Sequence, residues 1–187
     1  DDTSAASMIT SFTTTCGEIS ELPFIENFDT WETNINSFGQ CWNRLSSGAV
    51  TVYAYIKNTQ SVSQPNSLYM KCQGNNYSIV ALPKTKAALD SLQISFDIMK
   101  TISDAQNIEI GIMTDPTNAA TFNTISTYAV SAANTWEGVQ VQFDSYNGAQ
   151  GHIAIRIPSG EYIDYYIDNI VVDYIPDAVD WIVEQLE

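Results

Sequence analysis

Alternation of apolar and polar residues limits the fold of this 187-residue chain more than any other feature. In a β-strand, residues two apart lie on the same face, so strict alternation predicts a strand with one apolar face. Two antiparallel sheets that pack face to face bury such faces. We therefore predict an all-β sandwich. Four segments show the pattern cleanly: 92–99, 108–113, 139–143 and 153–157.

Shorter or less regular segments bring the predicted number of strands to about ten. Three long gaps, at 31–40, 57–66 and 115–124, are predicted loops, and loops are where binding residues tend to collect. The further strands are predicted at 22–29, 41–45, 49–56, 67–72, 77–82 and 162–174.

The length and the apolar content, 44% of the residues, fit one domain with its own core. We place this domain at residues 16–175, after a leader or edge segment at 1–15. Apolar residues behind Asp177 recur at helical spacing, which predicts a short C-terminal helical tail or the start of a linker at 176–187. No apolar run approaches the roughly 20 residues that a membrane-spanning helix needs.

The predicted strand at 162–174 has one break in its alternation. Ile163 and Ile167 share one face, whereas the apolar residues from Ile170 onward fall on the opposite parity. One extra residue must be absorbed at Asp168 or its neighbour, and a β-bulge does this while it re-aims nearby side chains. A strand buried on both faces is the alternative interpretation.

Charge narrows the choice of partners. The chain has 7 Lys and Arg against 22 Asp and Glu, a formal net charge of −15. An acidic surface repels phosphate backbones, so we exclude nucleic acid as a partner. The composition fits an extracellular bacterial protein, although an acidic cytosolic protein has a similar one. Acidic clusters also suit divalent cations.

Catalytic motifs are weak in this sequence. The single histidine, His152, has no Ser or Cys in a legible nucleophile motif. A glycosidase needs only two carboxylates at the right separation, and 22 acidic residues make that signal non-specific. The loop at Asp115 fails as an EF-hand, because Ala120 and Ser126 stand where such a loop needs Gly and Glu. We predict that the chain is not an enzyme.

Two features point to binding residues. Parity places Glu26 between Phe24 and Phe28 on one face, where a buried carboxylate needs a cation or several hydrogen-bond donors. Tyr53 and Tyr55 lie opposite the apolar face of their strand, where aromatic rings are free to stack on sugar rings. Partly buried sandwich tyrosines are the alternative interpretation.

The order of several motifs along roughly residues 16–175 resembles the MAM-like, choice-of-anchor J and cleaved-adhesin group of bacterial surface modules. Each motif is short, but their order over the whole domain is fairly specific. The motifs are Cys16, Leu-Pro-Phe-Ile-Glu-Asn-Phe-Asp at 22–29, Cys-Trp at 41–42, Asn-Ser-Leu-Tyr at 66–69, Leu-Pro at 82–83, Ile-Gly-Ile-Met-Thr-Asp-Pro at 110–116, Thr-Phe at 121–122, Gly-His-Ile-Ala-Ile-Arg at 151–156 and Ile-Asp-Asn-Ile at 167–170.

The resemblance implies a jelly-roll β-sandwich of the galactose-binding-like kind, used as a non-catalytic module in secreted proteins of Bacteroidetes and often holding a structural calcium. By motif, Glu26 and Asp168 match the acidic residues of the first and last strands, and we predict that they share one structural Ca²⁺ ion. Asp29 and Asn169 are the next candidate ligands. MAM domains often have Asp-Asp where this chain has Asp168 and Asn169, so an amide stands in place of the second carboxylate. The alternative is an exposed Glu26 and an Asp168 that hydrogen-bonds to backbone.

Three cysteines allow at most one internal disulfide. Cys16 and Cys41 flank the opening strand, and we predict that they pair and leave Cys72 reduced. A loop of this length contributes about 3 kcal/mol in the chain-entropy model. A bridge between Cys41 and Cys72, or three free thiols, are the alternatives.

The expected function is that of a non-catalytic adhesion or carbohydrate-binding module, monomeric, within a larger secreted or cell-surface protein. Its predicted ligand is a glycan, bound through Tyr53 and Tyr55. A host or surface protein as the partner, or a structural accessory role, is the alternative, because the fold does not fix the function. A glycosidase ranks third.

Overall fold

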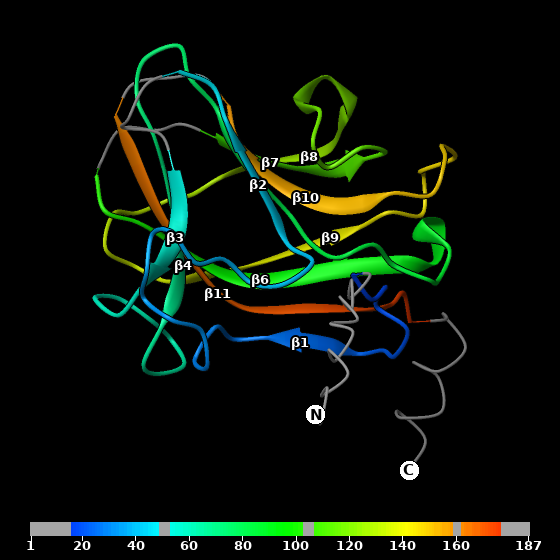
Figure 1. Cartoon of the computed structure of the whole chain (residues 1–187), viewed down its shortest axis with the longest axis horizontal. Helices are drawn as coiled ribbons and strands as arrows, with labels where there is room; N and C mark the ends of the chain where they lie inside the picture. Colours follow the sequence, from blue (N-terminus) through cyan, green and yellow to red (C-terminus); the bar gives the residue numbers. More distant parts are fainter. Residues whose placement is uncertain (1–15, 49–52, 103–106, 159–161, 177–187) are drawn as a thin grey trace, which may run out of the picture.

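Two packed β-sheets make up the part of the chain that the structure, a computed structural model, describes. This part contains eleven strands and two short 3₁₀ helices, η1 (Leu89–Ser91) and η2 (Ala119–Thr121). Figure 1 shows the two sheets as separate layers. The predicted leader and the predicted helical tail beyond residue 176 lie outside the described residues. The described residues are 16–48, 53–102, 107–158 and 162–176.

All the strand pairings are antiparallel, as expected for a sandwich without helical crossovers. The strands are β1 (Phe24–Glu26), β2 (Asn43–Ser46), β3 (Tyr53–Lys57), β4 (Ser67–Cys72), β5 (Ser78–Ala81), β6 (Leu92–Lys100), β7 (Asn107–Met113), β8 (Phe122–Ala129), β9 (Glu137–Gln142), β10 (His152–Ile157) and β11 (Ile163–Tyr174).

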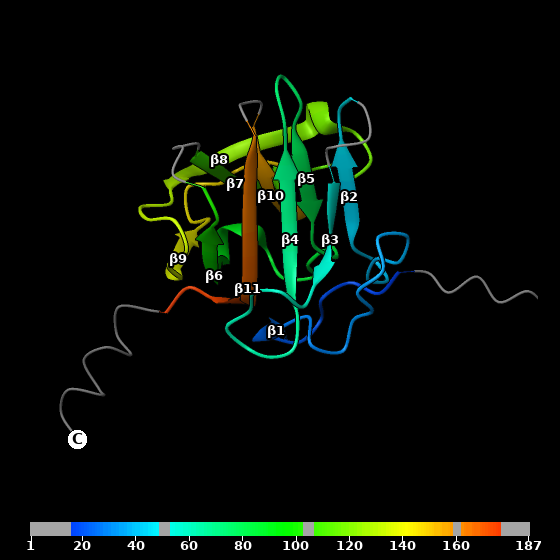
Figure 2. The same ribbon diagram turned by 90° about the vertical axis from the view of Figure 1, so that its left-hand side faces the viewer.

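The last strand, β11, occupies the middle of the six-stranded sheet, whose order is β3-β4-β11-β6-β9. β4 pairs with the first half of β11, and β1 pairs with the second half (Figures 1 and 2). The other sheet has five strands in the order β2-β5-β10-β7-β8. This two-sheet architecture confirms the predicted jelly-roll sandwich. None of the helices among the described residues has the length and apolar character needed to cross a membrane.

The core lies between the sheets and is built from alternating side chains. On β6, Leu92, Ile94, Phe96 and Ile98 are buried, and the strands β7, β9 and β10 bury their apolar residues in the same way. Each buried methylene contributes about 0.8 kcal/mol relative to water. The four segments with the cleanest alternation are thus four core strands, as predicted.

The bulge predicted in the last strand is present. The register between β11 and β6 shifts between Asp168 and Val171, and Asn169 has a φ of 51°, in the left-handed region. Before the shift, Ile163 and Ile167 face the core, and after it Ile170 does. The single break in parity therefore located the one irregularity of this strand correctly.

Two predicted elements differ from the structure. Predicted strand 22–29 is only three residues long, because the chain turns at Phe28, whose φ is 61°. Phe28 is fully buried but no longer shares strand parity with Glu26. The predicted loop at 115–124 ends in β8, which the sequence analysis missed. Its residues alternate poorly because β8 is an edge strand whose side chains are largely exposed or half-buried.

Candidate functional site

The two tyrosines expected to stack on sugars lie on the outer face of the six-stranded sheet. On β3, Ala54 and Ile56 point into the core, so Tyr53 and Tyr55 point away from it. Both side chains are half-buried. The structure adds two neighbours that the sequence analysis did not select, Tyr69 on β4 and Tyr166 on β11. We call these four residues the tyrosine face.

The four rings form a continuous row across three strands. Ring centroids are 5.0 Å apart for Tyr53 and Tyr55, and 5.1 Å apart for both Tyr55 with Tyr69 and Tyr69 with Tyr166. Tyr69 and Tyr166 are only 3% and 5% exposed, so the part of the row that a ligand can reach belongs mainly to Tyr53 and Tyr55. The planes of Tyr53 and Tyr55 meet at 49°, which gives a corrugated surface instead of one flat platform.

Two lysines add positive charge to this face of an acidic protein. The Lys57 ammonium lies 3.6 Å from the centre of the Tyr69 ring, and the Lys71 ammonium lies 4.0 Å from that of Tyr162. Such cation–π contacts hold a charged group at the edge of an aromatic surface. The period-2 pattern of β3 and β4 carries the signal for both, because Lys57 follows Tyr55, and Lys71 follows Tyr69, at a spacing of two.

Asp164 places a carboxylate beside the same rings. One of its oxygens, Oδ1, is buried and has no hydrogen-bond partner. Burial, and then the hydrogen bond to Asp164, raise the pKa of Tyr69 well above its usual range, so this tyrosine stays protonated. The tyrosine face therefore combines aromatic rings with phenol and ammonium donors.

A shallow polar cavity of about 400 Å³ lies over β6, β9 and the bulge of β11. Asn169 donates its side-chain amide to Asp97 at 2.8 Å, and Gln140 donates to Gln93 at 2.5 Å. A Cβ built on Gly138 would meet nothing within 4 Å, so the cavity is open above this glycine. Gln93 and Asp97 on β6 and Gln140 on β9 occupy the positions that point away from the core in two cleanly alternating strands.

Asp168, predicted as a metal ligand, is completely buried at the bulge. Its Oδ2 accepts the backbone N–H groups of Val62 at 2.7 Å and Ser63 at 3.0 Å. Its Oδ1 accepts the Ser63 hydroxyl at 3.0 Å and the Asn169 N–H at 2.8 Å. Burial raises the pKa of Asp168 above its ordinary value, and these hydrogen bonds oppose the rise. The carboxylate thus anchors the loop between β3 and β4.

Glu26, the other predicted shared ligand, is half-buried on β1. Its Oε1 accepts the N–H of Phe28 at 2.7 Å, a contact that closes the turn after the strand. Burial raises the pKa of Glu26 above its ordinary value, and hydrogen bonds from Phe28, Trp31 and Asn27 oppose the rise. Phe24 lines the same cavity as Glu26, so the carboxylate has the aromatic neighbour that the alternation of this strand predicted.

Asp29 and Asn169, the two secondary candidate ligands, also form hydrogen bonds within the protein. Asp29 accepts the N–H of Asn66 at 3.1 Å, and Asn169 is bonded to Asp97. Over the described ranges, no group of three or more His, Cys, Asp or Glu side chains is placed to hold a metal ion, so Glu26, Asp29 and Asp168 do not form such a group. A Ca²⁺ ion at Asp168 would compete with four donors for two oxygens. Calcium therefore stays a prediction.

The three cysteines and the single histidine are the remaining residues considered in the sequence. Cys16 and Cys41 are joined by a disulfide, with their Cα atoms 4.9 Å apart, and the buried Cys72 thiol donates to the carbonyl oxygen of Pro158 at 3.6 Å. Burial raises the pKa of the Cys72 thiol to about 11, which keeps it protonated at neutral pH. His152 is half-buried, with its Nδ1 2.8 Å from the carbonyl oxygen of Leu82.

By sequence, no family model matches the chain, and no curated protein matches it either. Solved structures do match. The K1 cleaved adhesin domain of Lys-gingipain from Porphyromonas gingivalis W83 superposes with a TM-score of 0.62 at 10% identity, covering 83% of this chain and 100% of that one. The shared fold is the jelly-roll β-sandwich.

Two carbohydrate-binding modules have the same sandwich. The C-terminal family 22 module of Clostridium thermocellum Xyn10B has a TM-score of 0.53 at 14% identity, covering 82% of this chain and 95% of that one. The CBM22-1 xylan-binding domain from Paenibacillus barcinonensis Xyn10C has a TM-score of 0.50 at 15% identity, covering 87% of this chain and 99% of that one. At these identities the likeness is one of fold, as the resemblance to the cleaved-adhesin group implied.

Proposed function

We propose that the chain is a non-catalytic module of a secreted or cell-surface protein and that it binds glycans through the tyrosine face. The observation that supports this most is the exposed edge of the row, where Tyr53 and Tyr55 lie between the Lys57 and Lys71 ammonium groups. Aromatic rings pack on the apolar faces of sugars, while ammonium, phenol and carboxylate groups hydrogen-bond to sugar hydroxyls. Neighbours of the same fold include modules named for binding carbohydrate and xylan.

The test is a glycan array followed by a titration of the best ligand with the variant Tyr53→Ala/Tyr55→Ala. Loss of two stacking rings weakens binding by about thirtyfold, because each ring contact contributes roughly 1 kcal/mol. The variant Tyr53→Phe/Tyr55→Phe keeps the rings and should retain most of the affinity. Tyr174→Ala is the matched control, because Tyr174 is 56% exposed and lies outside the tyrosine face.

A protein partner is the second candidate, and the tilt of the rings favours it. A pair that meets at 49° offers no flat platform for a sugar, whereas tyrosine is enriched at protein interfaces without any need for a flat arrangement. The array decides between the two. If no glycan binds the wild-type protein, the glycan proposal fails, and capture experiments with surface proteins should then depend on the same two tyrosines.

A further inference from the structure

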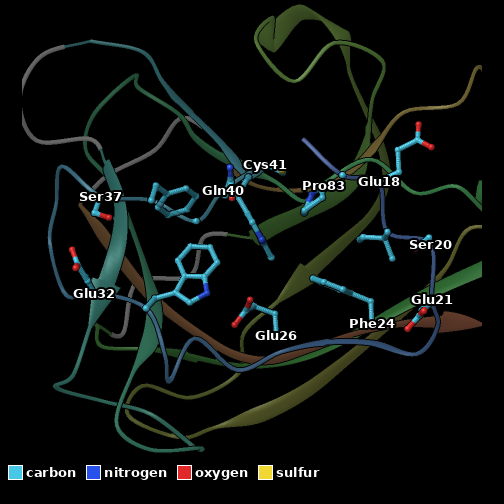
Figure 3. Close-up of a pocket in the computed structure, with 16 residues that line it drawn as sticks. Glu18, Ser20, Glu21, Phe24, Glu26, Glu32, Ser37, Gln40, Cys41 and Pro83 are labelled. Atoms are coloured by element: carbon cyan, nitrogen blue, oxygen red, sulfur yellow. The ribbon is translucent and has the colours of Figure 1, made fainter. Parts of the chain in front are cut away.

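A second cavity, of about 680 Å³, shares no residue with the tyrosine face. Its walls come from the segment 17–21, from β1, from the loop segments 31–32 and 37–42, and from Pro83. The disulfide between Cys16 and Cys41 joins the first of these walls to the loop. We call this cavity the disulfide pocket. Figure 3 shows its lining, with Glu26 between Phe24 and Glu32.

One side of the disulfide pocket is a fixed aromatic wall. The Trp31 ring lies 5.4 Å from that of Phe38 and 5.5 Å from that of Trp42, in both cases edge to face. A Cβ at Gly39 would collide with the Trp31 indole, so the absence of a side chain at this position lets the indole lie against the loop backbone. The wall is therefore preformed, which lowers the entropy cost of binding.

The pocket also contains carboxylates without a positive charge among its lining residues. Glu26 is half-buried within it, and Glu21 and Glu32 are exposed at its rim. Within the described part of the chain, the ion pairs are Lys84 with Glu18, at 3.5 Å, and Arg156 with Glu109. The charge of Glu26 is thus not neutralised by an ion pair there.

The basic residue against the aromatic wall is committed elsewhere. Arg44 lies over the Phe38 ring, 5.0 Å from its centre, but its guanidinium donates to the backbone carbonyls of Ala54 and Ile35. It closes the back of the wall. Lys84 pairs with Glu18 of the lining, so neither basic residue pairs with Glu26. A half-buried carboxylate in this position gains most from a ligand that brings its own positive charge and donors.

We infer that the disulfide pocket binds an organic cation on an apolar stem, the chemistry of a lysine or arginine side chain. The ammonium or guanidinium group would pair with the Glu26 carboxylate on its cavity side, next to the aromatic wall, where ion pairing and cation–π attraction add together. The apolar stem would pack on Phe24 and Trp42. The volume is within the usual range for sites of small ligands. The inference does not depend on the tyrosine face or on its ligand.

The test uses the full chain and follows the indole N–H signals by NMR. The ligands are the acetylated methylamides of arginine and lysine, with the norleucine derivative as an uncharged match. The arginine and lysine compounds should shift the Trp31 and Trp42 signals with saturation and leave Trp136, which lies outside the pocket, unchanged. No shift with either cation, or an equal shift with norleucine, would overturn the inference.

Variants locate the charge that matters. Glu26→Gln keeps the size of the side chain and an acceptor for the Phe28 N–H, and should weaken arginine binding by about tenfold, the change expected for one charge-assisted contact. Asp144→Asn removes the same charge from an exposed loop position outside the pocket and should bind like the wild type. Equal affinities for the two variants would contradict a site at Glu26.

Two further experiments identify the source of the cation and separate this inference from the glycan proposal. A peptide with two arginines that binds more tightly than the single amide identifies a protein segment as the ligand, and equal affinity identifies a small cation. The variant Tyr53→Ala/Tyr55→Ala should leave these titrations unchanged, because neither tyrosine lines the pocket. Loss of cation binding in that variant would place the site on the tyrosine face and overturn the inference.

Discussion

Glu26 and Asp168 lie on the paired strands β1 and β11, yet their surroundings differ. Asp168 is fully buried, and its two oxygens accept four hydrogen bonds, two from the N–H groups of Val62 and Ser63 in the loop between β3 and β4. Glu26 is half-buried, closes a local turn through Phe28 and borders the disulfide pocket. Burial raises the pKa of both carboxyl groups.

This contrast shows which of the two carboxylates is available to a ligand. When donors of the fold itself use the acceptor capacity of a carboxylate, its role is to position the chain. When a carboxylate faces a cavity whose lining brings no cation, its charge is available for recognition. Asp168 belongs to the first kind. Glu26 also accepts hydrogen bonds from Phe28, Trp31 and Asn27, but it borders the disulfide pocket and belongs to the second kind. Three predictions test this division.

The largest expected effect is that of Asp168→Ala on stability. The variant leaves the Val62, Ser63 and Asn169 donors without their buried acceptor, which should lower the free energy of unfolding by at least about 3 kcal/mol. Urea denaturation followed by tryptophan fluorescence measures the loss. Asp144→Ala, at an exposed position, should change the free energy little. A loss of similar size in both variants would mean that Asp168 is not an anchor.

The calcium prediction asks whether the two carboxylates act together after all. If Glu26 and Asp168 share an ion, Ca²⁺ at a hundred times its dissociation constant should stabilise the fold by about 2.7 kcal/mol relative to EDTA. The midpoint of thermal unfolding would rise accordingly, and Glu26→Gln would reduce the rise. An unchanged wild-type midpoint would show that the hydrogen bonds on Asp168 suffice without a cation.

The smallest expected effect is the pH dependence that Glu26 contributes. Burial raises its pKa above the ordinary 4.5, so the folded state binds the proton more tightly than the unfolded chain does. The contribution of this group to stability is therefore greatest below pH 4.5 and falls as the pH rises through the raised pKa. Glu26→Gln cannot titrate.

Urea denaturation of Glu26→Gln and the wild type between pH 4 and 7 measures this term, since both retain Asp168 and all other acids. The stability of the variant relative to the wild type should increase with pH across the window and then level off. A relative stability that is flat with pH would mean that Glu26 has the same pKa in the folded state as in the unfolded chain.

Much of the fold was predictable because its signals are local. Alternation within single segments gave the core strands, and one break in parity gave the bulge at Asp168. The strand β8 was missed because an edge strand with little burial need not alternate. The turn at Phe28 was missed because its positive φ is fixed by packing in the core, which a local pattern does not encode.

The sites were less predictable because they join distant segments. Tyr53 and Tyr55 were selected from the parity of one strand, but Tyr166, which completes their row, is more than a hundred residues away. The donors for Asp168 come from Val62 and Ser63, at separations of 106 and 105 residues. The sequence of neither segment specifies these hydrogen bonds, because they depend on the order of the strands in the sheet.

The central position of β11 has a consequence for how the chain is made. In the finished sheet, β3 pairs with β4 and β6 with β9, and until residue 163 and those after it are synthesised the strand that joins the two pairs is missing. Each pair then presents an open edge, a template for pairing with other chains. The sheet closes only when the last strand enters between β4 and β6, so the nascent domain depends on its final residues to hide those edges.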